Sequence, residues 1–217
     1  MTNGALAGRS LRQLVQTNPE ELMGRGWRGE YLPVLTKFID GRGMLPVHLH
    51  ADDETAQRLE GQANGKAEAW HILDAAPGAT ALVGLKEGVG PDTLREALLE
   101  QDFDSVMRRL PVPAGETIYV PGGTLHSFGP DTLVYEIEQT SDIQQHAMHW
   151  RMEDGSTLAD EQWRSNIEML LQELKPDPNP TSSPACVYRS TTASSGSSSA
   201  RALTSPSSVG EPGPQLR

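Results

Sequence analysis

The sequence predicts a mainly β protein, a jelly-roll barrel with a helical insertion and flanking helices. Short stretches of β-forming residues recur along the chain, and turns that contain Gly or Pro separate them. Only three segments have the spacing of apolar residues that is typical of helices. Many short strands with few helices favour a barrel or sandwich over a helical or α/β architecture.

The first predicted element is a short helix near the N-terminus. Ser10 and Gln13 have the spacing of a capping box, and the apolar residues Leu11, Leu14 and Val15 follow. Four strands are then expected, at residues 31–39, 45–50, 68–75 and 80–85.

A helical insertion is predicted over residues 91–110. Thr93 and Glu96 have capping-box spacing, and Leu94 and Leu98 lie one turn apart. Strands are expected to resume at residues 116–121, 125–129 and 133–139.

A final helix is predicted over residues 157–174, ended by Pro176. One face of this helix carries the apolar residues Trp163, Ile167, Leu170, Leu171 and Leu174.

The composition changes near Lys175 and divides the chain into two parts. Residues 1–175 are expected to form one domain, because this length suits a single hydrophobic core. In residues 176–217, more than half of the residues are Ser, Thr or Pro. Such a segment cannot bury enough apolar area to offset its backbone entropy, so a disordered tail is predicted there.

Bulk properties exclude several classes of partner. The net charge of −11 argues against nucleic acid or an anionic membrane surface. No apolar run approaches the roughly 18 residues of a membrane span, and the N-terminus lacks the layout of a signal peptide. The single cysteine, Cys186, excludes an internal disulfide. We therefore expect a cytoplasmic protein; its oligomeric state does not follow from the sequence.

Two histidines in the segment LPVHLHADDE are the first candidate functional residues. Alternate side chains of a strand share one face, so His48 and His50 are expected to point together while Val47 and Leu49 point the other way. This geometry suits two ligands of one metal ion.

Further candidate ligands come from two other predicted strands. Glu68 opens the strand at 68–75, and His126 follows the turn at residues 121–123. Three imidazoles and one carboxylate form a nitrogen and oxygen site that suits zinc, iron, manganese, nickel or copper. His71 lies three residues after Glu68 and therefore faces away from it, so it and His149 are expected to be structural.

The spacing of these candidates resembles the two motifs of the cupin superfamily: Gly43 with His48-x-His50 and a downstream Glu, then Gly115-x5-Pro121-x-Gly123-x2-His126. Longer stretches resemble the class I mannose-6-phosphate isomerases. These are NGALAGRSLRQLV, LPVLTKFIDGRGMLPVHLHADDE, GKAEAWHILDAAPGA, VMRRLPVPAGETIYVPGGTLHSFG and LVYEIEQTSD. The resemblance covers residues 3–151.

This resemblance implies a zinc-dependent isomerase on a cupin jelly roll that interconverts mannose 6-phosphate and fructose 6-phosphate. It places ligands of one divalent metal, Zn²⁺ by analogy with the family, at His48, His50, Glu68 and His126. It also implies that Lys66 contacts the phosphosugar substrate and that Glu136 and His146 act in catalysis.

The chain departs from the family at four places. His48 stands where the family usually has Gln, and His146 stands where SD-x3-R has arginine. The family implies a further segment before the NG-x-LAG stretch and often a second β-rich region where this chain has the Ser/Pro-rich tail. The resemblance therefore implies a chain shortened at its N-terminus, with a C-terminus that is either out of frame after a frameshift or diverged or truncated.

These departures leave two hypotheses open. The first is a metal-dependent mannose-6-phosphate isomerase, with full and impaired activity both left open. The alternative is a metal-binding cupin without isomerase activity, either an Fe(II) dioxygenase-type enzyme or a sugar-binding module, because three histidines and one glutamate also form the metal site of cupin dioxygenases.

Overall fold

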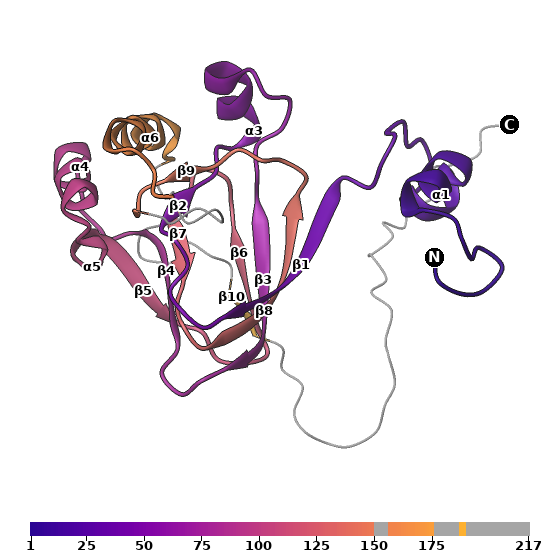
Figure 1. Cartoon of the computed structure of the whole chain (residues 1–217), viewed down its shortest axis with the longest axis horizontal. Coiled ribbons are helices and arrows are strands. Elements are labelled where there is room, and N and C mark those ends of the chain that lie inside the picture. Colours follow the sequence, from indigo (N-terminus) through magenta and orange to yellow (C-terminus); the bar gives the residue numbers. More distant parts are fainter. Residues whose placement is uncertain (150–155, 176–186, 190–217) are drawn as a thin grey trace, which may run out of the picture.

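A computed structural model describes residues 1–149, 156–175 and 187–189 of the chain. Two five-stranded antiparallel sheets face each other (Figure 1). The first, sheet A, has the order β1-β8-β3-β6-β10: β1 (Val34–Gly41), β8 (Thr132–Gln139), β3 (Glu68–Ala75), β6 (Glu116–Val120) and β10 (Val187–Arg189). The second, sheet B, has the order β5-β4-β7-β2-β9: β5 (Met107–Pro111), β4 (Thr80–Leu85), β7 (His126–Phe128), β2 (His48–Leu49) and β9 (Gln145–His146).

This arrangement confirms the predicted mainly β jelly roll. Every strand pairing among the described residues is antiparallel. The pairings keep the two sheets separate, so the described residues form a two-sheet jelly roll and not a closed barrel.

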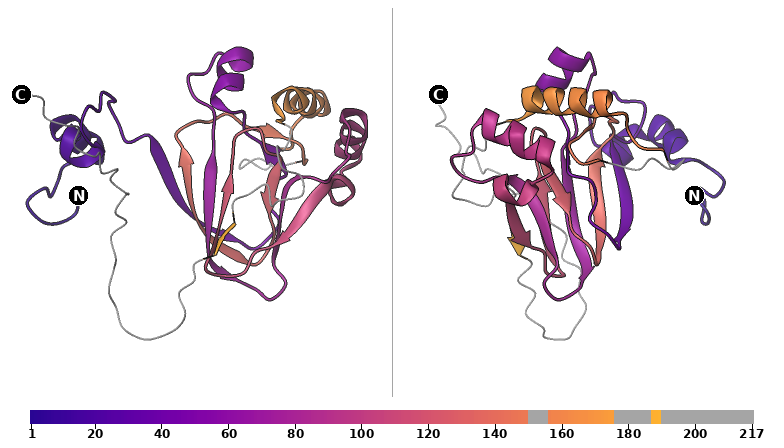
Figure 2. Two further views of the ribbon diagram at one scale, coloured as in Figure 1. Left: turned by 180° about the vertical axis from the view of Figure 1, so that it is seen from behind. Right: turned by 60° about the vertical axis from the view of Figure 1, so that its left-hand side comes forward.

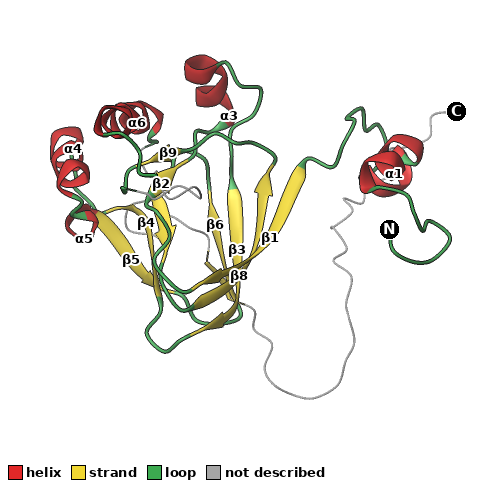
Figure 3. Ribbon diagram, viewed as in Figure 1, coloured by secondary structure: helices red, strands yellow, loops and turns green. Residues whose placement is uncertain are grey.

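Most of the helices lie beside the two sheets, and the first lies apart from them (Figure 3). They are α1 (Leu11–Thr17), α2 (Pro19–Met23), α3 (Asp53–Thr55), which continues into the π-helix η1 (Ala56–Glu60), α4 (Pro91–Glu100), α5 (Phe103–Val106) and α6 (Asp160–Glu173). The predicted capping box of α1 is present, because the Ser10 side chain accepts from the backbone of Gln13 and the Gln13 side chain accepts from that of Ser10. The last helix lies inside the predicted range.

The helical insertion predicted over residues 91–110 is present as two helices, α4 and α5, and the prediction was wrong at residues 107–110. Helix α4 ends at Glu100, because Gln101 adopts the left-handed conformation, with φ of 59°. Asp102 then caps α5 by accepting from the backbone of Ser105 at 3.3 Å, and residues 107–111 form strand β5. Pairing of β5 with β4 overrides the local helical pattern.

The predicted capping of this insertion by Thr93 and Glu96 was also wrong. Gly90 is the N-cap residue of α4, no side chain caps the helix, and Pro91 occupies its first turn.

Two hydrophobic cores lie on opposite sides of sheet B. Apolar residues on its outer face, such as Val47, Leu49 and Leu82, pack against Leu98 and Ile167 from the helices α4 and α6. Figure 2 shows these helices covering that face. The second core fills the space between the sheets and consists of Trp70, Ile72, Ala81, Val83, Val112, Ile118, Val120, Phe128 and Val134.

The outer face of sheet A differs, because no such helical layer packs on it among the described residues. Phe38 is 74% exposed, and Tyr119 and Ile137 are also exposed there. Helices α1 and α2 lie beyond the edge strand β1, away from the sheets (Figures 1 and 2).

Three residues of the segment expected to be a disordered tail form strand β10, which pairs with β6. The other residues of that segment, Cys186 among them, lie outside the described residues. The boundary of the domain near residue 175 therefore stays a prediction. Among the described residues, no helix has the length and apolar character needed to cross a membrane.

Candidate metal centre and substrate pocket

Close backbone contacts bring three segments together at one end of the sheets. The backbone N–H of Gly123 donates to the carbonyl of His50 at 2.6 Å, and that of Lys66 donates to the carbonyl of Ala51 at 2.9 Å. At Gly65, a Cβ atom would lie only 2.3 Å from the Ala51 carbonyl oxygen, so a glycine is needed for this approach. The segments that lead into β3 and β7 are thereby held beside the end of β2.

Strand β2 directs its two histidines into the space between the sheets. Val47 and Leu49 are fully buried in the core against the helices, so His48 and His50 point to the opposite face. This is the alternation that the sequence predicted. In register, His48 lies opposite His126 of β7 on one side and His146 of β9 on the other.

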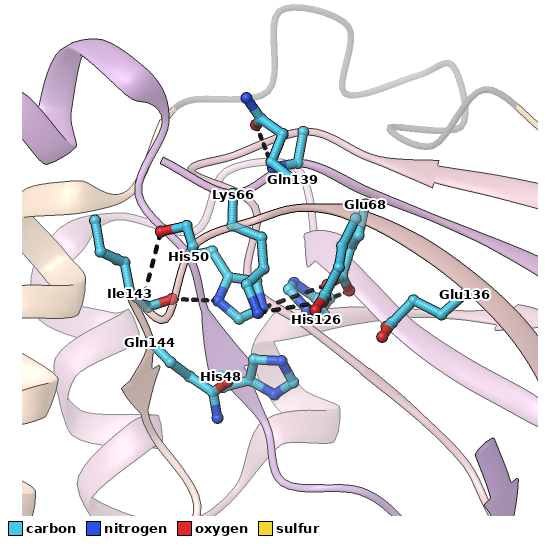
Figure 4. Close-up of polar contacts among 12 residues, drawn as sticks. His48, His50, Lys66, Glu68, His126, Glu136, Gln139, Ile143 and Gln144 are labelled. Carbon is cyan, nitrogen blue, oxygen red and sulfur yellow. Dashed lines mark hydrogen bonds and ion pairs between the residues drawn. The ribbon is translucent and has the colours of Figure 1, made fainter. Parts of the chain in front are cut away.

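The structure brings together the four side chains that the sequence singled out as metal ligands (Figure 4). His48, His50, Glu68 and His126 each offer one ligand atom, and these atoms all lie within 4.8 Å of one another. All four are buried except His48, which is partly exposed. His48 and His126 lie on sheet B, His50 directly follows β2, and Glu68 on sheet A supplies the carboxylate.

Backbone carbonyl groups fix the orientation of all three imidazole rings. Each ring places Nδ1 at hydrogen-bonding distance from a carbonyl oxygen, where the N–H donates. The carbonyls are those of Pro46, 2.6 Å from His48, Ile143, 2.7 Å from His50, and Thr124, 2.8 Å from His126. This protonates Nδ1 and leaves each Nε2 lone pair free to bind a metal, which is the usual arrangement of metal-ligating histidines.

The atoms that face each other at the centre of the cluster fit a bound cation. Glu68 Oε1 lies 2.9 Å from His126 Nε2, and its Oε2 lies 3.4 Å from His50 Nε2. His126 Nε2 is buried but makes no hydrogen bond of acceptable geometry. With Nδ1 protonated, two acceptor atoms are in contact, and an ion between them removes that conflict. The donor set is therefore one that could hold a divalent metal.

Burial and mutual contact control the protonation of these ligands. Burial holds the pKa of His48 well below its usual value, and the neighbouring His126 adds to this effect. The pKa of His50 is also lowered by burial. Burial alone would raise the pKa of Glu68, but His126 and His50 outweigh it and hold that pKa well below its usual range. Neutral imidazoles beside an ionised carboxylate are the forms that bind a metal.

His126 titrates differently from the other two imidazoles. Burial acts to lower its pKa, but the adjacent Glu68 carboxylate outweighs burial and raises it. A metal ion would compete with a proton for the same lone pair of His126.

A cavity of about 260 Å³ is lined by His48, His50 and Glu68 of this cluster. The sequence-predicted residues Lys66, Glu136 and His146 all line it, so the structure brings them next to the candidate metal ligands. Burial raises the pKa of Glu136, and the nearby Glu68 carboxylate contributes. The cavity walls therefore combine acid–base groups with a cation.

Two further residues of the cavity, Lys37 and Glu138, were missed in the sequence. Lys37 Nζ lies 2.6 Å from Glu138 and 3.1 Å from Glu136, and Lys66 Nζ lies 3.2 Å from Glu138. Burial alone would lower the pKa of Lys37, but the two glutamates outweigh it and raise that pKa. The alternation of Glu136 and Glu138 in LVYEIEQ was the available signal, since both must share one face of the strand.

His146 lines the same cavity on β9. The side-chain amide of Gln144 lies 2.8 Å from its Nε2 and donates to it. Burial lowers the pKa of His146, so its neutral form is favoured. A neutral ring is a weaker partner for an anion than the arginine that the resemblance expects at this position.

The two histidines expected to be structural lie away from the candidate ligands. His71 Nδ1 is 2.9 Å from the Thr117 hydroxyl on the neighbouring strand β6. His149 stacks on Trp163, with ring centroids 4.1 Å apart.

A separate buried carboxyl cluster joins β9 to two helical segments. Gln145 donates from Nε2 to Glu60 at the end of η1, at 3.0 Å, and to Glu173 at the end of α6, at 3.2 Å. Glu173 is fully buried. Burial and the adjacent Glu60 raise the pKa of Glu173 to about 8.

Comparisons with known proteins agree with this geometry. The chain is 34% identical over 140 residues to the mannose-6-phosphate isomerase of Streptococcus mutans, which covers 64% of this chain and 43% of that protein. It is 33% identical over 140 residues to the mannose-6-phosphate isomerase ManA of Bacillus subtilis, again over 64% of this chain and 44% of the relative. The chain thus spans less than half the length of these relatives. No family model matches it.

Solved structures point to the same family. The mannose 6-phosphate isomerase from Bacillus subtilis superposes with a TM-score of 0.69 and 27% identity, over 80% of this chain and 54% of that chain. A variant of the phosphomannose isomerase from Salmonella typhimurium, 13% identical with a TM-score of 0.59, covers 80% of this chain and 62% of its own and supports the fold alone. The chain is therefore a homologue of the mannose-6-phosphate isomerases over 64% of its length and has their cupin fold.

Proposed function

We propose that the protein is a metal-dependent isomerase that interconverts mannose 6-phosphate and fructose 6-phosphate, with Zn²⁺ as its metal. The observation that carries this proposal is the convergence of three oriented imidazoles and one carboxylate beside a cavity, in a chain related to mannose-6-phosphate isomerases. His48, His50, Glu68 and His126 are the proposed ligands. The proposed substrate is a phosphosugar, and a cytoplasmic location stays a prediction.

The reaction needs a proton to leave C2 of the aldose and a proton to arrive at C1, through an enediolate. A divalent cation at this site would stabilise the negative charge that develops on the two oxygens. The residues of the chain must bind the sugar, hold it in one orientation and transfer the proton.

Glu136 is the proposed proton-transfer group. It lines the cavity and is buried, and its raised pKa moves it toward the pH at which a carboxyl group can both accept and donate a proton. Lys66 is proposed to contact the phosphate of the substrate, because it is a cation that lines the same cavity. His146 is proposed to lie next to the developing charge, in the place of the family arginine.

An isomerase assay on the purified chain tests the proposal. The protein is loaded with Zn²⁺ and given mannose 6-phosphate, and fructose 6-phosphate is detected with a coupling enzyme. We expect slow, metal-dependent formation of fructose 6-phosphate that Glu136→Gln reduces by about 10²-fold or more. No product from the metal-loaded wild type would contradict the proposal.

One observation favours a second candidate function. Three histidines and one glutamate also suit Fe(II), and His48 supplies the third imidazole where the family usually has Gln. A cupin that keeps the metal without isomerising sugars, either as an Fe(II) dioxygenase-type enzyme or as a sugar-binding module, would show no fructose 6-phosphate. The Fe(II)-loaded protein would consume oxygen if it is a dioxygenase-type enzyme, and would not if it is a sugar-binding module.

A further inference from the structure

The position of Glu138 gives it contact with both cations of the cavity. Glu138 lies on β8 between β1 and β3, and the residue is only 3% exposed. Its Oε1 lies 2.6 Å from Nζ of Lys37, and its Oε2 lies 3.2 Å from Nζ of Lys66. In register it stands opposite Glu68, so a buried carboxylate is placed beside another one. Like charges in this position repel, and the two lysines offset that repulsion.

The charge of the cavity outside the candidate metal ligands is balanced. The described residues that line the cavity include two lysines, Lys37 and Lys66, and no arginine. Two glutamates outside the ligand set, Glu136 and Glu138, face these lysines. The two carboxylates therefore weaken the attraction between the two lysines and an entering phosphate group. Because Lys66, Glu136 and Glu138 are buried, solvent screens their interactions much less than at the surface, whereas Lys37 is partly exposed.

Of the two glutamates, Glu138 has the larger effect on an incoming anion. Glu136 contacts Lys37 alone, at 3.1 Å, whereas Glu138 contacts both lysines. Each ammonium group has three donors. Lys37 directs donors to two carboxylates, and Lys66 directs one donor to Glu138. Both lysines therefore keep donors that could bind a phosphate, but the two glutamates cancel their positive charge.

We propose that Glu138 is a specificity-determining residue, which by pairing with both Lys37 and Lys66 lowers the affinity of the cavity for phosphorylated sugars relative to unphosphorylated ones. The proposal rests on the proposed function only in taking a sugar as the ligand of this cavity. It makes the chain a weak discriminator between a hexose and its 6-phosphate. The weak discrimination then comes from the carboxylates of the cavity, and not from a lack of lysines.

Binding measurements on Glu138→Gln test this directly. Titration calorimetry at one ionic strength compares the Kd of fructose 6-phosphate with that of fructose, and turnover is not needed. We expect Glu138→Gln to bind fructose 6-phosphate at least about tenfold more tightly than the wild type, because one buried negative charge near the phosphate is gone. The Kd of fructose should stay unchanged, whereas a merely structural role would change both values together.

Asp40→Asn is the matched control. Asp40 lies on the same strand as Lys37, is exposed and does not line the cavity. Asp40→Asn changes the net charge by the same amount as Glu138→Gln, but away from the cavity. Its affinity for fructose 6-phosphate should equal that of the wild type. A folded Glu138→Gln protein with equal or weaker phosphosugar binding would overturn the proposal, as would an equal gain in Asp40→Asn.

A double variant keeps the test decisive if Glu138→Gln does not fold. Glu138→Gln combined with Lys66→Gln removes one negative and one positive charge. The remaining lysine, Lys37, keeps Glu136 as a carboxylate partner. We expect its Kd for fructose 6-phosphate to lie near the wild-type value. A loss of more than about tenfold would show that the contact of Lys66 with the phosphate outweighs the charge of Glu138, and would overturn the proposal. The wild type could also fail to isomerise mannose 6-phosphate while Glu138→Gln binds fructose 6-phosphate more tightly, as expected. That result would contradict the isomerase proposal and support the role of Glu138.

Discussion

The two sheets enclose the same cavity but contribute opposite chemistry to it. On the side of sheet B, the cavity is lined by His48 of β2, by His50 directly after it and by His146 of β9. On sheet A, longer strands supply carboxylates and Lys37. Sheet B carries a layer of helices on its outer face, and the outer face of sheet A exposes Phe38. A helical layer thus packs behind the strands that carry the imidazoles, and the selection between ligands proposed above falls to the charges on sheet A.

The largest expected effect comes from removing one imidazole of sheet B. His126→Ala should lose most of the metal, because one of four ligands is gone and the ring of His126 is central to the cluster. Elemental analysis should give close to one equivalent for the wild type. His71→Ala is the control, since this histidine faces the other side of β3. Full metal retention in His126→Ala would rule out this set of ligands.

A change at His146 should alter the rate and leave the metal content unaffected. We expect His146→Arg to raise kcat by up to about 10²-fold, because a permanent charge would replace a ring whose pKa is lowered by burial. Steady-state kinetics on mannose 6-phosphate measure this. A lower kcat in the variant, with metal still bound, would show that the histidine is itself suited to the reaction.

The helical layer on sheet B can be tested by stability. Ile167→Ala should lower the free energy of unfolding by about 2–5 kcal/mol, because it opens a cavity in the core between α6 and sheet B. Phe38→Ser on the exposed face of sheet A should change it by less than about 0.5 kcal/mol. Chemical denaturation compares the two variants. Equal losses would mean that the outer face of sheet A is also a packed surface.

A smaller, pH-dependent effect is expected at Glu173. Its pKa is raised to about 8 by burial and by Glu60, so the folded state favours the protonated form. The stability it contributes is fully present below the unfolded pKa of about 4.5 and is lost as the pH rises toward 8. Glu173→Gln should therefore show a higher Tm than the wild type at pH 8.5 and a similar Tm at pH 5. An identical difference at both pH values would contradict this.

The sequence was sufficient for most of the fold and for the cluster of candidate ligands. Alternation in LPVHLH placed His48 and His50 on one face, and that local rule holds because Val47 and Leu49 need the apolar side. Long-range pairing was harder to predict. Strand β5 forms because β4 lies beside it, not because its residues favour a strand.

The sequence predicted only some of the charged residues of the pocket, because the others depend on long-range strand pairing. Lys66 and Glu136 were expected from a resemblance, whereas Lys37 and Glu138 become neighbours only through the registers of β1, β8 and β3. A one-residue shift of any of these strands would turn their side chains to the other face. No pattern within a single segment reports that register.

X-ray absorption on the zinc-loaded wild type tests the central claim most directly, that three imidazoles of sheet B and one carboxylate of sheet A hold one metal ion. The account predicts nitrogen and oxygen scatterers at about 2.0–2.2 Å, with the outer-shell signal of about three imidazole rings. His126→Ala, if it is loaded at high zinc concentration, should show one ring fewer. A spectrum without imidazole scattering, or with sulfur at about 2.3 Å, would contradict it.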